Sequence, residues 1–146
     1  MSQSNAQNYL HLVFHTKNTT PLITPEIENS LYEYLGGICK KLNSPSIAIG
    51  GHINRVHILF KLSKNISLSQ CVQKIKSNSS KWVKIMYPSS QNFYWQDGYG
   101  GFSIGQSQVS NYINNQHIHH QKISFKDEYI ALLKEYDVDY NEDYLW

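Results

Sequence analysis

Apolar and polar side chains alternate strictly between residues 9 and 16 of this 146-residue chain. One face of the segment is leucine and phenylalanine and the other carries two histidines, which is the period of a β-strand. Two further strands are predicted at 46–50 and 55–62, because both are rich in β-branched and aliphatic side chains and the pair Gly50-Gly51 marks a bend between them. The first half of the chain is therefore expected to supply three strands.

Apolar residues elsewhere recur at spacings of three and four, the period of an amphipathic helix. Four helices are predicted on this basis, at 24–42, 67–86, 107–120 and 124–136. The first has a clear start signal, with Thr24 as N-cap and Pro25 at the first helical position. The last opens with Ser124 followed three residues later by Asp127, in the manner of a capping box.

A short hairpin is predicted between the second and third helices. Residues 93–95 and 102–104 would be its strands, and a glycine-rich turn lies between them. The element order is then β, α, β, β, α, hairpin and two helices, which predicts an α+β domain with a ferredoxin-like antiparallel sheet and the two long helices on one of its faces. The other face of this sheet is expected to be open.

Composition narrows the class of protein. Hydrophobic residues make up 40% and charged residues 16%, which is typical of a globular chain, so we expect one domain over 1–146 with 1–7 disordered. The chain has no signal-peptide pattern and no apolar run long enough to span a membrane. Cys39 and Cys71 have no metal or redox spacing and are expected to be reduced, which favours the cytoplasm.

Charge is distributed unevenly, although the formal net charge is only +2. Six lysines and no acidic residue lie between Lys61 and Lys84, and three of them, Lys74, Lys81 and Lys84, fall on the polar face of the second helix. Such a face is either simply solvated or contacts phosphate groups of a nucleic acid, which its single sign of charge permits. Eleven tyrosines are compatible with stacking on bases, and equally with positions at the edge of a core.

Two ionisable side chains interrupt the third predicted strand, within the sequence GGHINRVHILFKL. The period of two puts Arg55 and His57 on one face and the apolar residues Val56, Ile58 and Phe60 on the other. We expect Arg55 and His57 on the open face of the sheet. They lie either at a solvated edge, or in a hydrogen-bonded core, or in a functional site.

Tyr112 and Gln116 lie one turn apart on the third predicted helix, so that a phenol and a neutral oxygen ligand would project together. Tyr112 could equally be the aromatic member of the helix's apolar stripe. A histidine cluster at 117–120 could be exposed, face DNA or bind a metal. Phosphate-binding P-loops, dinucleotide GxGxxG motifs, HExxH and CxxC are all absent from the sequence.

Several blocks together resemble the single-tyrosine HUH transposases of small bacterial insertion sequences, the IS200-like transposase family. The resemblance covers nearly the whole chain, in the expected order and spacing. The blocks are LVFHTKNTTPLIT, GGHINRVHILFKL, SNSSKWVK, WQDGYGGFSIGQSQVSNYINNQHIHH and ISFKDEYIALLKEYDVDY. The block from Trp95 to His120 is the most specific of them.

This resemblance implies a metal-dependent DNA strand transferase that cleaves and rejoins single-stranded DNA at hairpins near the ends of a mobile element. It places the nucleophile on Tyr112, which becomes joined to the 5′ phosphate. It also implies a divalent ion, Mg²⁺ or Mn²⁺, held by His57 and Gln116, and a homodimer as the working form.

The sequence departs from the family pattern where the first histidine of the HUH pair should lie, because that position is Arg55. A guanidinium has no lone pair to give to a metal, so it cannot replace the ligand. Arg55 could instead contact the scissile phosphate, and His52 could be recruited if the bend turned it inward. Two functions therefore stay open: a transposase, and a catalytically impaired relative that binds hairpin DNA without cutting it.

Overall fold

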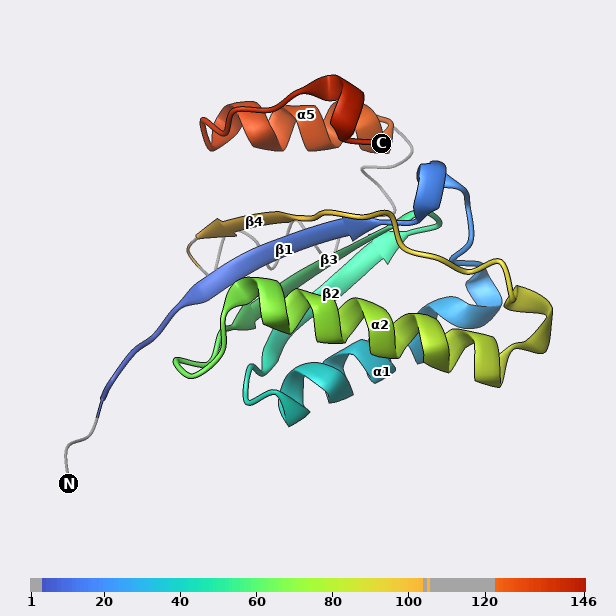
Figure 1. The fold of residues 1–146 in the computed structure, drawn as a ribbon, viewed down its shortest axis with the longest axis horizontal. Coiled ribbons are helices and arrows are strands. Elements are labelled where there is room, and N and C mark those ends of the chain that lie inside the picture. Colours follow the sequence, from blue (N-terminus) through green and yellow to red (C-terminus); the bar gives the residue numbers. More distant parts are fainter. Residues whose placement is uncertain (1–3, 104, 106–122) are drawn as a thin grey trace.

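The computed structural model describes residues 4–103, 105 and 123–146 of the chain, and over these residues it forms one four-stranded antiparallel sheet with helices on both faces (Figure 1). The chain order of the elements is β1 (Tyr9–His15), α1 (Pro25–Lys41), β2 (Ser46–His52), β3 (Arg55–Lys61), α2 (Leu68–Met86), β4 (Gly100–Ser103) and α5 (Phe125–Glu135). Short 3-10 turns lie at Lys17–Thr19, Pro88–Ser90 and Glu142–Tyr144.

The sheet has the strand order β2-β3-β1-β4 with all pairs antiparallel, which is the order of a ferredoxin-like fold. β1 and β3 are the two central strands, and their register pairs His15 with Arg55 and Val13 with His57. β3 is covered by α1 and α2 on one face and by α5 on the other, which explains its nearly continuous apolar run. The predicted fold class is confirmed.

The main core lies between the sheet and the helix pair α1 and α2, on the lower side of the sheet in Figure 1. Val56, Ile58 and Phe60 point into this core, as the alternation predicts. Each is fully buried, and burial of such a side chain stabilises the fold by roughly 1.5–3 kcal/mol. The apolar stripes of the two helices complete the core with Ile27, Leu31, Leu35, Ile38, Cys71, Val72, Ile75 and Val83.

The helix starts follow the local sequence. Ser67 forms a complete capping box with Gln70 at the start of α2, because each side chain bonds the other residue's backbone N–H. The Ser124 hydroxyl accepts a hydrogen bond from the Asp127 backbone N–H at the start of α5. Thr24 lies at the N-cap of α1, but its side chain makes no capping hydrogen bond there.

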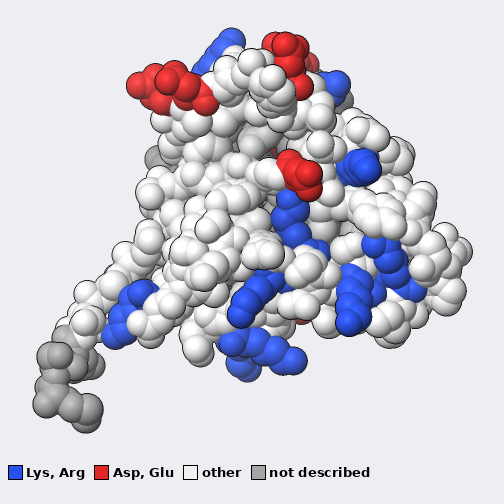
Figure 2. Space-filling model, viewed as in Figure 1, with Lys and Arg blue, Asp and Glu red and all other residues white. Residues whose placement is uncertain are grey.

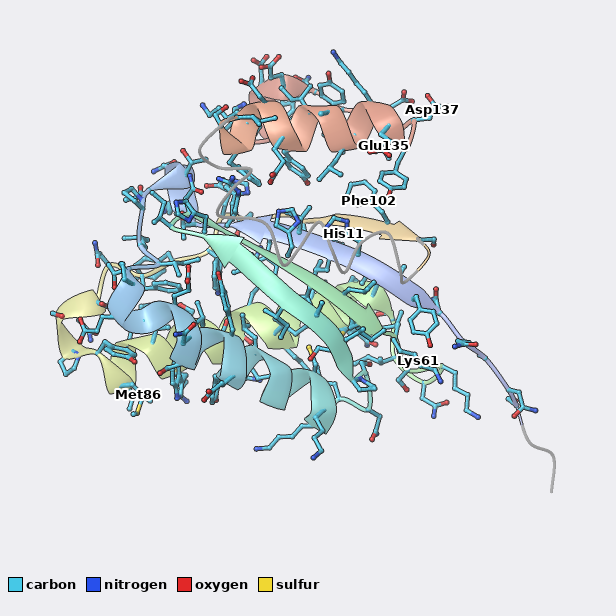
Figure 3. All side chains as sticks on the ribbon, turned by 180° about the vertical axis from the view of Figure 1, so that it is seen from behind. His11, Lys61, Met86, Phe102, Glu135 and Asp137 are labelled. Carbon is cyan, nitrogen blue, oxygen red and sulfur yellow. The ribbon has the colours of Figure 1, made fainter. Side chains whose placement is uncertain are left out.

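The prediction of an open sheet face is wrong, because α5 covers it. Figure 3 shows labelled Phe102 and His11 in the layer between the sheet and this helix. A second apolar cluster joins Val13 and Phe102 of the sheet to Phe125, Tyr129, Leu132 and Leu133 of α5. The periodicity of α5 predicted a helix with an apolar stripe, but a stripe does not say which surface it will cover.

Two other expectations concern the segment after α2. The predicted strand at 93–95 is absent: Trp95 makes only an isolated bridge to Thr16, and β4 begins at Gly100. The predicted helix at 107–120 lies outside the described residues. In the described ranges, no helix is long and apolar enough to cross a membrane.

Replacement of glycine by alanine should change the stability of the protein in opposite directions at two positions. A Cβ at Gly51 of β2 would collide with the backbone carbonyl of Arg55, whereas a Cβ at Gly37 within α1 meets no atom within 4 Å. Gly51→Ala should therefore destabilise the protein by about 2 kcal/mol or more, and Gly37→Ala should stabilise it by roughly 0.5–1 kcal/mol. Urea unfolding of both variants tests this, and a stable Gly51→Ala variant would contradict the close packing of the β2–β3 turn.

Candidate functional site

Four polar side chains meet between the sheet and α5. They are His11 of β1, Arg55 and His57 of β3, and Glu128 of α5. Arg55 and His57 are 0% exposed, His11 is 1% exposed and Glu128 is 3% exposed. Polar groups are buried this deeply only when other polar groups satisfy them, so their contacts determine how the two layers fit together.

The contacts form a continuous chain. His11 Nε2 lies 2.8 Å from His57 Nδ1, and His57 Nε2 lies 3.0 Å from Glu128 Oε1. A carboxylate only accepts hydrogen bonds, so His57 Nε2 carries the proton that it donates to Glu128. In neutral His57 the other nitrogen, Nδ1, then accepts a hydrogen bond that His11 Nε2 donates. The rings of His11 and His57 are stacked, with centroids 5.0 Å apart.

Arg55 joins the chain at the same carboxylate oxygen. Its Nε lies 3.3 Å from Glu128 Oε1, and its Nη1 donates to Asn54 Oδ1 at 3.1 Å. The ring of Phe125 covers the guanidinium, with the ring centroid 5.6 Å from Cζ. A fully buried cation requires a nearby anion because water cannot solvate it. Glu128 supplies that anion from α5.

His11 is held neutral at this site. The pKa of His11 is lowered to about 3, mainly by burial and then by the nearby His57, while Glu128 acts in the opposite direction. The neutral ring can donate from one nitrogen and accept at the other, which suits its position in a chain of hydrogen bonds.

The described residues around His57 do not fit a divalent ion as they are arranged. Both ring nitrogens of His57 are in hydrogen bonds, and the Arg55 guanidinium contacts the same Glu128 oxygen as His57 Nε2. A guanidinium offers no lone pair and repels a second cation. In the part of the chain that the structure describes, no group of three or more His, Cys, Asp or Glu side chains could hold a metal ion.

The structure brings together only part of the site predicted from sequence. Arg55 and His57 share one face of β3, as predicted. Tyr112 and Gln116 lie outside the described residues. His52, at the end of β2, pairs with Arg55 in the sheet register.

Helix α2, which carries Lys74, Lys81 and Lys84, lies on the other side of the sheet from Arg55 and His57 (Figure 1). Lys74 and Lys81 are exposed. Lys84 is half-buried, with Nζ 3.7 Å from the centroid of the Tyr94 ring and 3.1 Å from the Ser80 hydroxyl. Figure 2 shows Lys and Arg gathered over the part of this view where α2 lies, and acidic side chains at the C-terminal end of the chain.

Sequence reasoning missed His11 and Glu128. His11 was assigned only to the second face of the first strand, and Glu128 only to a helix. A signal was present for both. His11 alternates with the core residues of β1, and Glu128 interrupts the apolar stripe of α5 beside Tyr129. A carboxylate within an apolar stripe indicates a buried cation as its partner.

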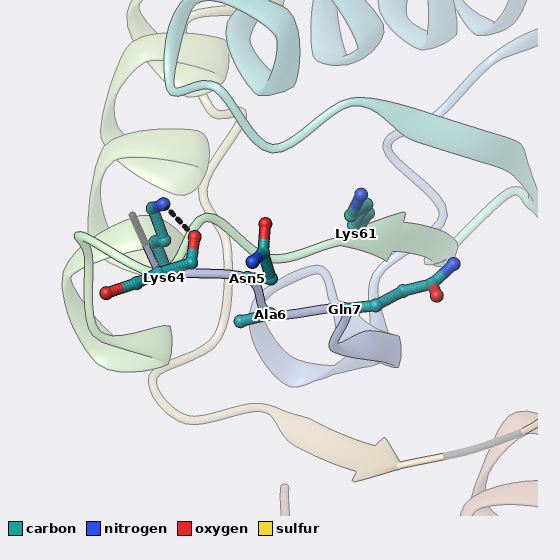
Figure 4. Close-up of a pocket in the computed structure, with 6 residues that line it drawn as sticks. Asn5, Ala6, Gln7, Lys61 and Lys64 are labelled. Carbon is teal, nitrogen blue, oxygen red and sulfur yellow. Dashed lines mark hydrogen bonds between the residues drawn. The ribbon is translucent and has the colours of Figure 1, made fainter. Parts of the chain in front are cut away.

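A hollow at the far end of β3 is a separate feature (Figure 4). It has a volume of about 570 Å³ and is lined by residues 4–7 with Lys61 and Lys64. The Lys64 ammonium donates to the backbone carbonyl of Ser4. Lys61 is six residues from Arg55 along β3, or roughly 20 Å in a strand, so this hollow does not belong to the buried site.

Comparison with known proteins gives a family and a fold. A family model described as "Transposase IS200 like" matches residues 4–116. A predicted transposase from Deinococcus radiodurans R1 superposes with a TM-score of 0.64 at 19% identity, covering 80% of this chain and 98% of its own. A REP-associated tyrosine transposase bound to a REP hairpin superposes with a TM-score of 0.59 at 14% identity, covering 84% and 76% respectively. No curated protein matches the sequence.

His15, on the sheet face that α5 covers, should make the stability of the folded protein depend on pH. The residue is 3% exposed, and burial, followed by Lys76 and Lys126, lowers its pKa from 6.5 to about 4. Between these two pH values His15 is protonated in the unfolded chain and neutral in the folded protein. The free energy of unfolding therefore falls as the pH drops from about 6.5 to about 4. The contribution is at most roughly 1.4 kcal/mol per pH unit.

Urea unfolding of the wild type and of His15→Gln between pH 7.5 and 4 measures this effect. The difference in unfolding free energy between the two proteins should shrink as the pH falls, because only the wild type loses the contribution of His15. Parallel pH profiles would show that His15 does not cause the pH dependence of stability.

Proposed function

Because the chain belongs to the IS200-like transposase family, we propose that it cleaves and rejoins single-stranded DNA through a 5′-phosphotyrosine intermediate. The observation that carries this proposal within the fold is the pairing of Arg55 and His57, which donate side by side to one anionic oxygen on the predicted face of β3. The same pair can donate to the oxygens of a phosphodiester. We expect the enzyme to act on DNA in the cytoplasm.

The proposed nucleophile is Tyr112. Its phenol loses a proton, its oxygen bonds to phosphorus, and the 3′ oxygen of the adjacent nucleotide leaves as a hydroxyl after taking up a proton. The new bond keeps the phosphodiester linkage, so the reverse attack by a DNA 3′ hydroxyl rejoins the strand without a nucleotide cofactor. Arg55 and His57 would stabilise the negative charge that builds on the phosphate oxygens in the transition state.

The proposed substrate is a single-stranded DNA hairpin. The REP-associated tyrosine transposase of similar fold is bound to a REP hairpin, and the exposed Lys74 and Lys81 of α2 offer phosphate contacts away from the buried site. Lys74, Lys81 and Lys84 would then position DNA over the face of the sheet that α1 and α2 cover. These contacts would be electrostatic, so binding should weaken steeply as salt is added. The proposed working form of the enzyme is a homodimer.

The metal remains a prediction. The family pattern assigns Mg²⁺ or Mn²⁺ to His57 and Gln116, and the described residues around His57 do not by themselves fit an ion. A second candidate function follows from the same observation: a relative that binds hairpin DNA without cutting it. The buried Arg55, in the place of a ligand histidine, favours this candidate.

A covalent adduct distinguishes the two functions. The protein is incubated with single-stranded hairpin oligonucleotides and Mn²⁺, and the products are separated under denaturing conditions. A transposase should give a protein–DNA adduct that Tyr112→Phe abolishes, because only the phenol forms the linkage. Salt-sensitive binding of the hairpin with no adduct would reject cleavage and leave the binding function.

Replacement of Arg55 by histidine should raise the affinity for Mn²⁺. Arg55→His removes the buried cation and places a second imidazole beside His57 and the Glu128 carboxylate, three groups that metals accept as ligands. Titration calorimetry should detect about ten-fold or tighter binding than in the wild type. Arg55→Lys is the matched control, since it keeps the charge and gives no ligand at neutral pH. Equal affinities in all three proteins would show that residue 55 is not the missing ligand position.

A further inference from the structure

We propose that the Glu128 carboxylate occupies the place of a DNA phosphate against Arg55 and His57, so that α5 is a lid that must leave before the site accepts DNA. This inference rests on the proposed function, because it takes Arg55 and His57 as the groups that receive a phosphate. The additional claim is that Glu128 of the same chain competes with that phosphate for the two donors.

The chemistry of the carboxylate supports the exchange. One oxygen, Glu128 Oε1, receives both the Arg55 Nε contact at 3.3 Å and the His57 Nε2 hydrogen bond at 3.0 Å. A phosphodiester also presents anionic oxygens that accept from a guanidinium and an imidazole. Both anions therefore satisfy the same two donors, and only one of them can do so at a time.

Burial makes the two occupants mutually exclusive. Arg55 and His57 are completely inaccessible while α5 is in place, and Phe125 of the same helix covers the guanidinium. A DNA strand is far wider than the space that a single carboxylate fills. It can reach the two donors only if α5 moves away from the sheet.

The packing of α5 permits such movement. Among the described hydrophobic residues, the cluster under α5 contains only Val13 and Phe102 from the sheet, whereas α1 and α2 share the large core on the opposite face. Departure of Glu128 alone would leave the Arg55 charge buried without its anion, which is unfavourable. Arrival of a phosphate removes that penalty, so opening and DNA binding are coupled.

The competing explanation is a permanent core ion pair that only stabilises the fold. It predicts that neutralising Glu128 weakens the protein and does not improve DNA binding. If α5 is a lid, loss of the Glu128 charge should strengthen DNA binding.

Glu128→Gln tests the difference because it keeps the shape of the side chain and removes its charge. Glu135→Gln is the matched control, an exposed acid on the same helix. Both are made in a Tyr112→Phe background, so that cleavage does not disturb the measurement, and fluorescence anisotropy gives the Kd for a single-stranded hairpin oligonucleotide at fixed salt. Glu128→Gln should bind about 5-fold or more tightly than Glu135→Gln. Equal or weaker binding, or no binding by either protein, would overturn the proposal.

Hydrogen exchange of the unmutated chain provides a second test if Glu128→Gln fails to fold. Amides of residues 125–135 should exchange faster when the hairpin is added, while those of α1 and α2 should not. Unchanged or slower exchange in α5 would overturn the lid. The adduct assay reports on cleavage separately, so an adduct with no change in α5 rejects the lid alone, and a moving α5 with no adduct rejects cleavage alone.

Discussion

The pairing of a buried guanidinium with a buried carboxylate determines how the second face of the sheet is built. Arg55 lies on a central strand with no exposed surface, and its charge can be accommodated there only beside an anion. Glu128 provides that anion and at the same time fixes the ring of His57. The position and rotation of α5 on the sheet follow from this contact together with the apolar residues around it.

The two faces of the sheet therefore have different physical characters. The face toward α1 and α2 is a continuous apolar core, the larger of the two clusters of buried hydrophobic residues. The face toward α5 combines a small aromatic cluster with a chain of hydrogen bonds through His11, His57 and Glu128. Stability is concentrated on the first face, which leaves the second free to carry polar groups that a core would not tolerate.

Periodicity was sufficient to predict the strands β1, β2 and β3, the two long helices and the side of β3 on which Arg55 and His57 lie. These features depend on local alternation and on helix start signals, and both involve residues that are close together in the sequence. The position of α5 was not predictable, because its stripe could cover any apolar surface of suitable shape. Glu128 was missed for the same reason: its role depends on Arg55, a residue 73 positions away in the sequence.

The shared oxygen of Glu128 has a consequence for how this site can evolve. A substitution at residue 55 alone leaves a carboxylate buried without its cation, and a substitution at residue 128 alone leaves the cation without its anion. The two positions are thus expected to change together in descendants of this chain, as a compensating pair. Histidine at residue 55 is the exception, because a captured ion could then replace the lost positive charge.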